Sequence, residues 1–245
     1  KYPKEKYGAI IILMKVAIMQ PTYLPWSGYF SLLNSVDLFV FLDSVQFDKR
    51  SWQQRNQIKS VNGAQWLTVP VLSKGKREQK INQVQLDLSS KFNVKHIKSI
   101  THSYKKTPYF DEVSESIFSA MKRTELNLAE YNIGIIEAIN SLLGITTKTI
   151  YSSNLSLSGN KADLLSSICV EVGATEYVSP PGSMNYLDET DAFNKVNIPV
   201  KYFKFIQPTY KQLYGDFIEN MSIVDLLMNC GNESANLIER GVMKE

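Results

Sequence analysis

The amino-acid sequence predicts an α/β protein with a mainly parallel sheet and a helical insertion over about residues 90–145. Two observations lead to this class. Apolar, β-prone runs alternate along the chain with segments of helical periodicity, the pattern of a sheet covered by helices. One of those runs, Asp37–Leu42 (DLFVFL), is almost wholly apolar, as strands are when both faces of a parallel sheet are buried. We expect residues 14–245 to form one domain and residues 1–13 to be a leader or an added extension.

The domain is predicted to begin with a βαβ unit. Lys15–Met19 (KVAIM) reads as a buried strand, and Gln20–Trp26 as a loop that its two prolines keep extended. A helix with an apolar face follows over Ser27–Val36, and Asp37–Leu42 is the second strand.

The remaining elements follow from periodicity and from turn residues. Further strands are predicted at Trp66–Leu72, Ile81–Leu88, Thr147–Tyr151, Glu176–Ser179 and Val200–Phe205. Helices are predicted at Lys91–Tyr104, Phe110–Met121, Leu126–Leu143, Lys161–Val172 and Ser222–Met228. Ser73–Lys80 and Gly182–Tyr186 are predicted loops. In the last helix Ser222 is the expected N-cap, with Asp225 in a weak capping-box position.

Composition excludes several classes of protein. Hydrophobic residues make up 44% and charged residues 21% of the 245 residues, which excludes a disordered chain, a collagen or a coiled coil. With two cysteines and two histidines, we expect neither a disulfide framework nor a metal site, and we expect a reducing, cytoplasmic location. The apolar run Ala9–Met19 is interrupted by Lys15 and is too short for a membrane span.

Charge is distributed unevenly. From Asp48 to Lys106 there are thirteen Lys or Arg residues against three acidic ones, a net charge of +10, whereas the remainder has fourteen basic and twenty-one acidic residues, a net charge of −7. Such a segment indicates an anionic ligand such as a nucleotide phosphate, or else a solvated basic surface. Nucleic acid is not the expected partner, because the sequence has no motif for it.

The loop Gln20–Trp26 is the first candidate site, because ligands of open α/β sheets bind at the carboxyl ends of the strands. Gln20 and Thr22 can orient polar groups of a ligand, and Tyr23 and Trp26 can stack on a base or a sugar. The alternative is that the aromatic residues only pack in the core at this junction.

A second candidate segment runs from Asp43 to Lys59 and is predicted to be a loop followed by a helix. Lys49 and Arg55 have the chemistry to neutralise phosphate. Asp43 can orient an amine or a hydroxyl, or act as a general base if its pKa is raised. The other candidate ligand contacts in this segment are Gln46, Asn56 and Lys59. A solvated surface is the alternative for its basic residues.

Three later positions and the histidines complete the candidates. Lys161 stands at a helix N-terminus, where phosphate is favoured, or marks an ordinary helix start. Ser179 and Tyr186 are the expected contacts from a Pro/Gly-rich loop. His102 is either a general base or a structural residue, and His96 is expected on the surface.

Several long segments, in the same order along the chain, resemble the WbqC-like family, whose name comes from bacterial O-antigen and surface-polysaccharide gene clusters. The resemblance runs from about Met14 to the C-terminus. The segments that carry it are Gln20–Phe30 (QPTYLPWSGYF), Asp43–Lys59, Trp66–Val71, Tyr104–Phe110, Lys161 with its helix, Ala174–Ser179, Tyr186–Asp188 and Pro208–Gly231 with Tyr210, Gln212, Ser222, Asp225 and Asn229.

The resemblance implies a cytoplasmic transferase that modifies a nucleotide-linked amino sugar, by N-acyl or aminoacyl transfer to the sugar amine. A non-catalytic binding or scaffold protein of the same pathway is the alternative. A weaker likeness to pantothenate synthetases implies a nucleotidyltransferase-like (Rossmann-like) fold and carboxylate activation by ATP. The chain departs from that pattern at Pro25–Trp26, where paired histidines would bind ATP phosphates. ATP with magnesium and an acyl-thioester therefore both stay open as the source of the acyl group.

Overall fold

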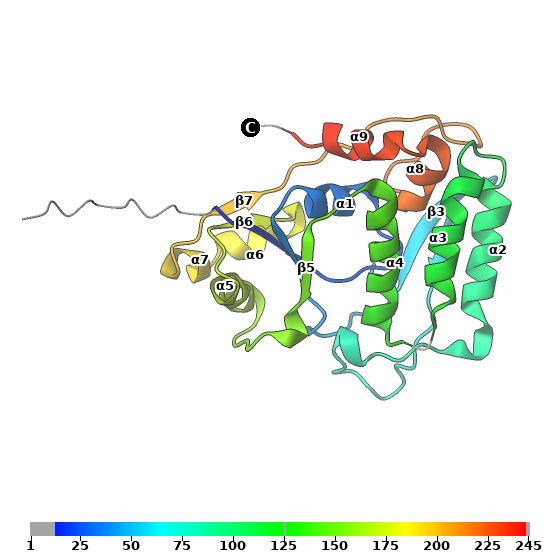
Figure 1. The fold of residues 1–245 in the computed structure, drawn as a ribbon. Helices are drawn as coiled ribbons and strands as arrows, with labels where there is room; N and C mark the ends of the chain where they lie inside the picture. Colours follow the sequence, from blue (N-terminus) through cyan, green and yellow to red (C-terminus); the bar gives the residue numbers. More distant parts are fainter. Residues whose placement is uncertain (1–12, 125, 244–245) are drawn as a thin grey trace, which may run out of the picture.

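The computed structural model describes residues 13–124 and 126–243, and its centre is a five-stranded parallel sheet (Figure 1). The strands are β1 (Lys15–Met19), β2 (Leu38–Phe41), β5 (Lys148–Tyr151), β6 (Glu176–Ser179) and β7 (Val200–Tyr202). Their order across the sheet is β5-β2-β1-β6-β7, and every neighbouring pair is parallel. The predicted α/β class with a parallel sheet is confirmed.

Alternate side chains of the central strands enter two different cores, because successive residues of a strand point to opposite faces. Ala17, Phe39 and Phe41 pack with α1 (Ser27–Asn34), α4 (Leu128–Leu143) and α8 (Ile223–Cys230). Val16 and Val40 pack on the other face with α5 (Lys161–Glu171) and α7 (Ala192–Lys195). The sheet is therefore covered on both faces, which explains why β2 is apolar along its whole length.

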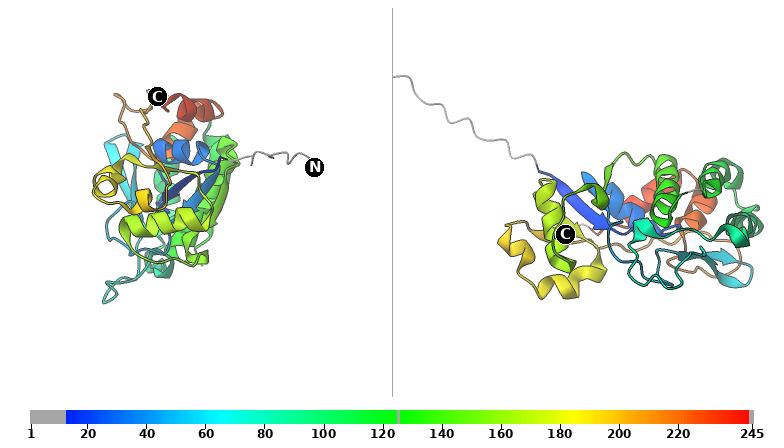
Figure 2. Two further views of the ribbon diagram at one scale, coloured as in Figure 1. Left: turned by 90° about the vertical axis from the view of Figure 1, so that its left-hand side faces the viewer. Right: turned by 90° about the horizontal axis from the view of Figure 1, so that it is seen from below.

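Three helices lie on the side of the sheet away from α5 and α7, with two of them, α2 and α3, at the far edge of the molecule in Figures 1 and 2. They are α2 (Phe92–Tyr104), α3 (Phe110–Lys122) and α4, and they match the predicted helical insertion. Gly144 ends α4 with a φ of +68°, the left-handed conformation that favours glycine at this position. Among the described residues, no helix is both long and apolar enough to cross a bilayer.

The second half of the predicted loop–helix segment at Asp43–Lys59 is a strand, so that prediction was wrong. β3 (Arg55–Ser60) pairs in antiparallel register with β4 (Gly63–Thr68), and the turn between them ends at Gly63 with a φ of +90°. The hairpin lies against α2 and α8. The strand predicted at Trp66–Leu72 therefore begins earlier, inside this hairpin, and ends before Pro70.

Two further predictions of secondary structure were wrong. Ile81–Leu88 contains only isolated bridges between two 3₁₀ turns, η1 (Ile81–Gln83) and η2 (Leu88–Ser90). Gly182–Tyr186 is not a loop, because η4 (Pro181–Ser183) and α6 (Met184–Asp188) cover it. The structure adds η3 (Ser152–Asn154), α7 and α9 (Glu233–Arg240), none of which was predicted.

Candidate functional site

A cleft of about 1020 Å³ lies at the carboxyl ends of β1, β2 and β5. It is bordered by residues just after the three strands, by the 80–83 turn and by the start of α5. The residues that matter below are Gln20, Gln46, Lys80, Asn82, Gln83, Ser152, Ser153, Asn160 and Lys161. We call it the basic cleft, because Lys80 and Lys161 are the charged residues among the described part of its lining.

The N-terminus of α5 opens into the basic cleft. Its N-cap, Asn160, makes no side-chain capping bond, and Lys161 follows with a φ of +50°, unusual for a residue with a side chain. The two residues follow Gly159, where an added Cβ would lie 2.9 Å from Cβ of Asp163. A helix start of this kind, with a lysine beside unpaired backbone N–H groups, is suited to bind an anion.

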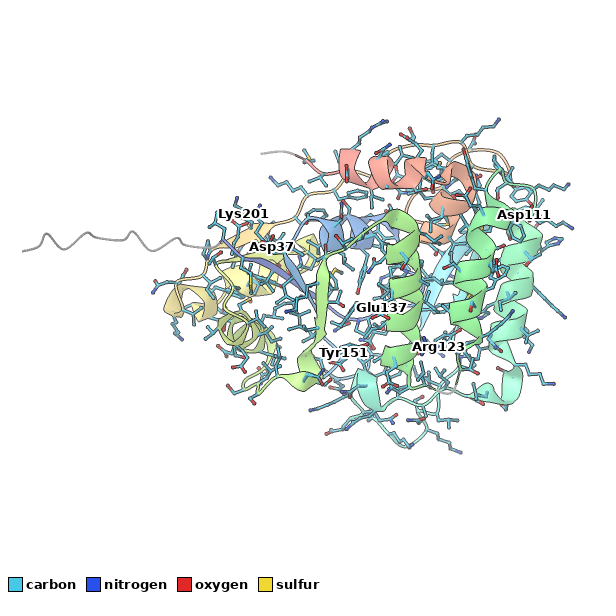
Figure 3. The ribbon with its side chains drawn as sticks, in the orientation of Figure 1. Asp37, Asp111, Arg123, Glu137, Tyr151 and Lys201 are labelled. Atoms are coloured by element: carbon cyan, nitrogen blue, oxygen red, sulfur yellow. The ribbon has the colours of Figure 1, made fainter. Side chains whose placement is uncertain are left out.

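A second cleft of about 540 Å³ shares Asn82, Gln83 and Ser153 with the first. Its charged lining residues are Asp43 and Glu130, with no Lys or Arg, so we call it the acidic cleft. Figure 3 labels Tyr151 at the end of β5, on the border of this cleft. Burial raises the pKa of Tyr151, and the nearby carboxylates of Glu137, Glu130 and Asp43 raise it further.

Asp43 lies two residues after the end of β2, and its side chain contacts the residues that follow β5. Its side chain is 2% exposed. Oδ1 accepts hydrogen bonds from Oγ of Ser152 and from the backbone N of Ser153, both at 2.9 Å. Oδ2 accepts from Oγ of Ser153 at 2.6 Å and from Nδ2 of Asn82 at 3.3 Å. The carboxylate of Asp43 thus accepts hydrogen bonds from four donors at the border between the two clefts, and it fixes the positions of these donors.

A third, mainly apolar cavity of about 310 Å³ adjoins the loop Gln20–Trp26. Thr22, Trp26 and Asn56 line it, so it contains three of the predicted ligand contacts. Its other lining residues are Met19, Pro25, Tyr29, Trp52 and Asn220. We call it the apolar cavity. Among the described residues, its lining contains no Lys, Arg or His.

Gln20 and Trp26 have separate surroundings at the two ends of this loop. Gln20 lines the basic cleft, and its Oε1 accepts a hydrogen bond of 2.9 Å from Nε2 of Gln53. Trp26 folds back over Gly28 and meets Phe205 edge to face, with ring centroids 5.5 Å apart.

Tyr23 and His96 lie in the core. Tyr23 is fully buried, stacks on Tyr131 with ring centroids 6.1 Å apart, and its hydroxyl lies 2.8 Å from Nδ1 of His96. Tyr23 therefore has no face free for a ligand. The prediction that His96 lies on the surface was wrong, because the ring is only 8% exposed and burial lowers its pKa to about 4.

Three predicted contacts of the second segment lie apart from one another. Gln46 lines the basic cleft and donates a hydrogen bond to the carbonyl of Arg77. Lys49 is exposed and lines none of the three cavities. Arg55 places its guanidinium 4.3 Å from the ring centroid of Trp66.

Lys59 is buried and serves the fold. Its Nζ donates to Oε1 of Gln212 at 3.0 Å and to the carbonyls of Gly215 and Asp216. Its backbone N donates to the hydroxyl of Tyr104.

Asp225 is the centre of this buried network. Its carboxylate accepts hydrogen bonds of 2.8 Å from Tyr104 and from Tyr210, and the nearby Lys59 adds a favourable charge. Burial nevertheless raises the pKa of Asp225. The expected capping box is absent: Ser222 does cap α8, through a 3.3 Å bond from the backbone N of Val224, but Asp225 points into the network.

Two of the remaining candidates, His102 and Ser179, lie away from the clefts. His102 is exposed on α2 and lines none of the three cavities. Ser179 is fully buried at the end of β6 and bonds to Oγ of Ser183. The backbone of Tyr186 lies in α6, while its side chain lies outside what the structure describes. Lys161, in contrast, borders the basic cleft.

Sequence reasoning missed several lining residues of the clefts, namely Lys80, Asn82, Glu130, Tyr151, Ser152 and Ser153. A signal for some of them was present. Ser152 and Ser153 follow a predicted strand just as Asp43 does, and the carboxyl ends of neighbouring parallel strands meet at one edge.

Comparison with known proteins agrees with the resemblance in the sequence. The model of the WbqC-like protein family matches residues 20–237. The chain belongs to the WbqC-like family. The matched range includes every residue that lines the basic and acidic clefts, and all of the apolar cavity except Met19.

A curated relative supports this membership. The chain is 37% identical over 228 residues to the uncharacterized protein Rv1507c of Mycobacterium tuberculosis, and the match covers 92% of this chain and 98% of the relative. No solved structure matches the chain significantly.

Proposed function

We propose that this WbqC-like protein is a transferase that adds an acyl or aminoacyl group to the amine of a nucleotide-linked sugar in surface-polysaccharide biosynthesis. The observation that supports this proposal is the pairing of a basic cleft with an acidic one across shared residues. An amino-sugar nucleotide has the matching charges, with a diphosphate at its centre and an amine on its sugar. Clefts whose charges are complementary to those of the ligand favour one orientation of the bound ligand.

The diphosphate would bind in the basic cleft. Lys161 and the first N–H groups of α5 would hold one phosphate, and Lys80 lies in the same lining. Gln20 and Gln46 would contact neighbouring polar groups. The volume of about 1020 Å³ lies at the upper end of the range for ligand pockets, as a nucleotide sugar requires.

The sugar amine would lie in the acidic cleft, near Asp43 and Glu130. In the proposed reaction the amine loses a proton to a carboxylate and its lone pair attacks the carbonyl carbon of the acyl donor. A C–N bond forms, the bond from the carbonyl to the donor's leaving group breaks, and the leaving group takes up a proton. Because an amine needs only deprotonation and orientation, no Ser–His or Cys–His pair is required.

The strand order supports a Rossmann-like, nucleotidyltransferase-type fold as part of this proposal. Numbered along the chain, the five parallel strands lie in the order third, second, first, fourth, fifth, as in doubly wound nucleotide-binding sheets.

The test is to incubate the purified protein with a dTDP-linked 4-amino-4,6-dideoxy sugar and to follow product masses. One reaction contains ATP, magnesium and a mixture of amino acids, and the other contains acyl-thioesters. We expect a new mass equal to the sugar nucleotide plus an acyl or aminoacyl group. We expect Asp43→Asn to lower turnover at least a hundredfold with unchanged binding of the sugar nucleotide. Absence of product in both reactions would contradict the proposal.

One observation favours a second candidate, a protein that binds the sugar nucleotide without catalysis. Both carboxylate oxygens of Asp43 already accept hydrogen bonds from the protein, which is the arrangement of a structural carboxylate. Clear calorimetric binding of the sugar nucleotide, with no product in either reaction, would support this candidate.

A further inference from the structure

We propose that the apolar cavity and the tryptophans beside it bind the acyl donor, with the acyl group inside the cavity and a phosphorylated carrier against Arg55. This inference rests on the proposed function, because it assigns the second substrate of that reaction. It differs from the sugar-nucleotide site both in place and in ligand chemistry.

The lining of the cavity selects a hydrocarbon group. Met19, Pro25, Trp26, Tyr29 and Trp52 supply most of its wall. The polar side chains in the wall are those of Thr22, Asn56 and Asn220, together with the hydroxyl of Tyr29, which donates to the carbonyl of Gln20. The side-chain amide of Asn56 is already paired within the protein. Its Nδ2 donates a hydrogen bond to the carbonyl of Leu24, and its Oδ1 accepts one from the backbone N of Gln57.

The hydroxyl of Thr22 makes no hydrogen bond to the residues that the structure describes. A sugar with several hydroxyl groups would leave most of its polar atoms unpaired here, at a cost in free energy for each. One hydroxyl group is enough for the single carbonyl oxygen of an acyl group. The volume of about 310 Å³ suits one short acyl group and is too small for a nucleotide sugar.

A platform of aromatic rings leads away from the cavity. Trp52 lines the cavity and is 52% exposed, and its ring centroid lies 5.5 Å from that of Trp66, which is 42% exposed. Arg55 stacks on Trp66 and makes no ion pair with any described residue. Its N–H groups are therefore free to bind an anion at the outer end of the platform.

The chemistry of the platform favours a small anionic ligand over a protein surface. Exposed tryptophan faces bind the flat or apolar parts of a carrier, and an unpaired guanidinium binds its phosphates. The cavity, the aromatic platform and the guanidinium follow one another in space. They match the order of the acyl group, the linker and the phosphate in such a donor.

The position of the cavity suits transfer to the sugar amine. Met19, the last residue of β1, lines the apolar cavity, and the next residue, Gln20, lines the basic cleft, so the two sites adjoin the end of the same strand. The Gln53–Gln20 hydrogen bond ties the segment that contains Trp52 to the rim of the basic cleft.

The chain itself supplies the probe, because its three tryptophans are Trp26, Trp52 and Trp66 and all of them border this site. We would titrate the full chain with coenzyme A, acetyl-coenzyme A and butyryl-coenzyme A and follow tryptophan fluorescence. Each added CH₂ group that enters the cavity should tighten binding about four-fold, because burying one CH₂ group contributes about 0.8 kcal/mol to the binding free energy. Arg55→Ala should weaken binding of all three ligands about five- to ten-fold.

Trp52→Ala should remove the dependence on chain length. The matched control is Leu72→Ala, another exposed apolar residue that lines none of the three cavities, and it should behave like the wild type. Equal affinity for coenzyme A and butyryl-coenzyme A, or unchanged binding by Trp52→Ala, would overturn the inference. Product formation from ATP and an amino acid, without binding of any thioester, would overturn it and leave the proposed function standing. Tight, chain-length-dependent binding without sugar product would support this site and contradict the proposed function.

Discussion

Replacing Asp225 with alanine should destabilise the fold more than any exposed substitution. The carboxylate is fully buried and accepts hydrogen bonds from the hydroxyls of Tyr104 and Tyr210 at 2.8 Å each. The charge of the buried Lys59 also favours the ionised carboxylate, and the described residues show no direct ion pair between the two. These contacts join α2, the hairpin, α8 and the segment around residue 210.

The magnitude follows from the groups left without a partner. Asp225→Ala removes the acceptor of two buried hydroxyls, and an unsatisfied buried group costs about 1–3 kcal/mol. Two such hydroxyls lose their acceptor, and the loss of the weaker attraction to Lys59 adds to this cost. We therefore expect a loss of about 3–5 kcal/mol in the free energy of unfolding, a large part of the about 5–15 kcal/mol of a typical domain.

Urea unfolding followed by circular dichroism measures this loss. Tyr210→Phe should lose about 1 kcal/mol, because it removes one hydroxyl and leaves the carboxylate its bond from Tyr104. Asp191→Ala is the matched control, because Asp191 is exposed, and it should change stability by less than about 0.5 kcal/mol. A loss below about 1 kcal/mol for Asp225→Ala, with an unchanged urea dependence, would show that the network does not hold the elements together.

Three further predictions use other parts of the molecule. Because burial lowers the pKa of His96 to about 4, the unfolded chain takes up a proton between about pH 6.5 and 4 that the folded chain does not. Unfolding free energy should therefore fall by about 2–3 kcal/mol from pH 7 to 4.5, and His96→Asn should lack that part of the change. Gly28→Ala should cost about 1–3 kcal/mol in urea unfolding, because its Cβ would lie 2.3 Å from Cη2 of Trp26. Lys161→Ala should weaken calorimetric binding of dTDP about five- to ten-fold, whereas Lys49→Ala should change it less than two-fold.

The sheet and its helices were predictable because burial on both faces leaves a strong signal in the sequence. A strand such as Asp37–Leu42 has no polar face, and the helices around it repeat their apolar residues with a period near 3.6. The structure confirms β2 at Leu38–Phe41 and β6 at Glu176–Ser179 with little or no shift.

The hairpin was missed because its first strand is polar. Arg55–Ser60 (RNQIKS) has neither a long apolar run nor a clear alternation, so periodicity alone could not identify it. The turn did contain a signal, since Asn62–Gly63 is the dipeptide most typical of tight hairpins. At Ile81–Leu88 the error was of the opposite kind: apolar residues at suitable spacing are buried in turns, without a neighbouring strand to pair with.

The candidate site was predictable only in part, because the sequence does not reveal which polar side chains are buried and hydrogen-bonded in the core. Asp43 and Gln20 lie at strand ends, and the structure brings both to the clefts. Lys59 is as basic as any surface lysine in the sequence, yet three protein acceptors surround its ammonium. Of the thirteen basic residues between Asp48 and Lys106, only Lys80 lines a cleft, so the charge excess of that segment did not locate the site.

The alternation of a β-strand places the two proposed substrate sites on opposite sides of one strand end. Successive residues of β1 point to opposite faces, so Met19 borders the apolar cavity on the α1 side while Gln20 borders the basic cleft on the α5 side. A polar and an apolar substrate can then approach the same edge of the sheet without competing for one pocket. In the proposed reaction the two substrates would meet beside the hydrogen-bonded Gln20–Gln53 pair, which lies between these two sides. A variant that removes this pair, Gln53→Ala, should therefore alter turnover while leaving the separate affinities for dTDP and butyryl-coenzyme A unchanged.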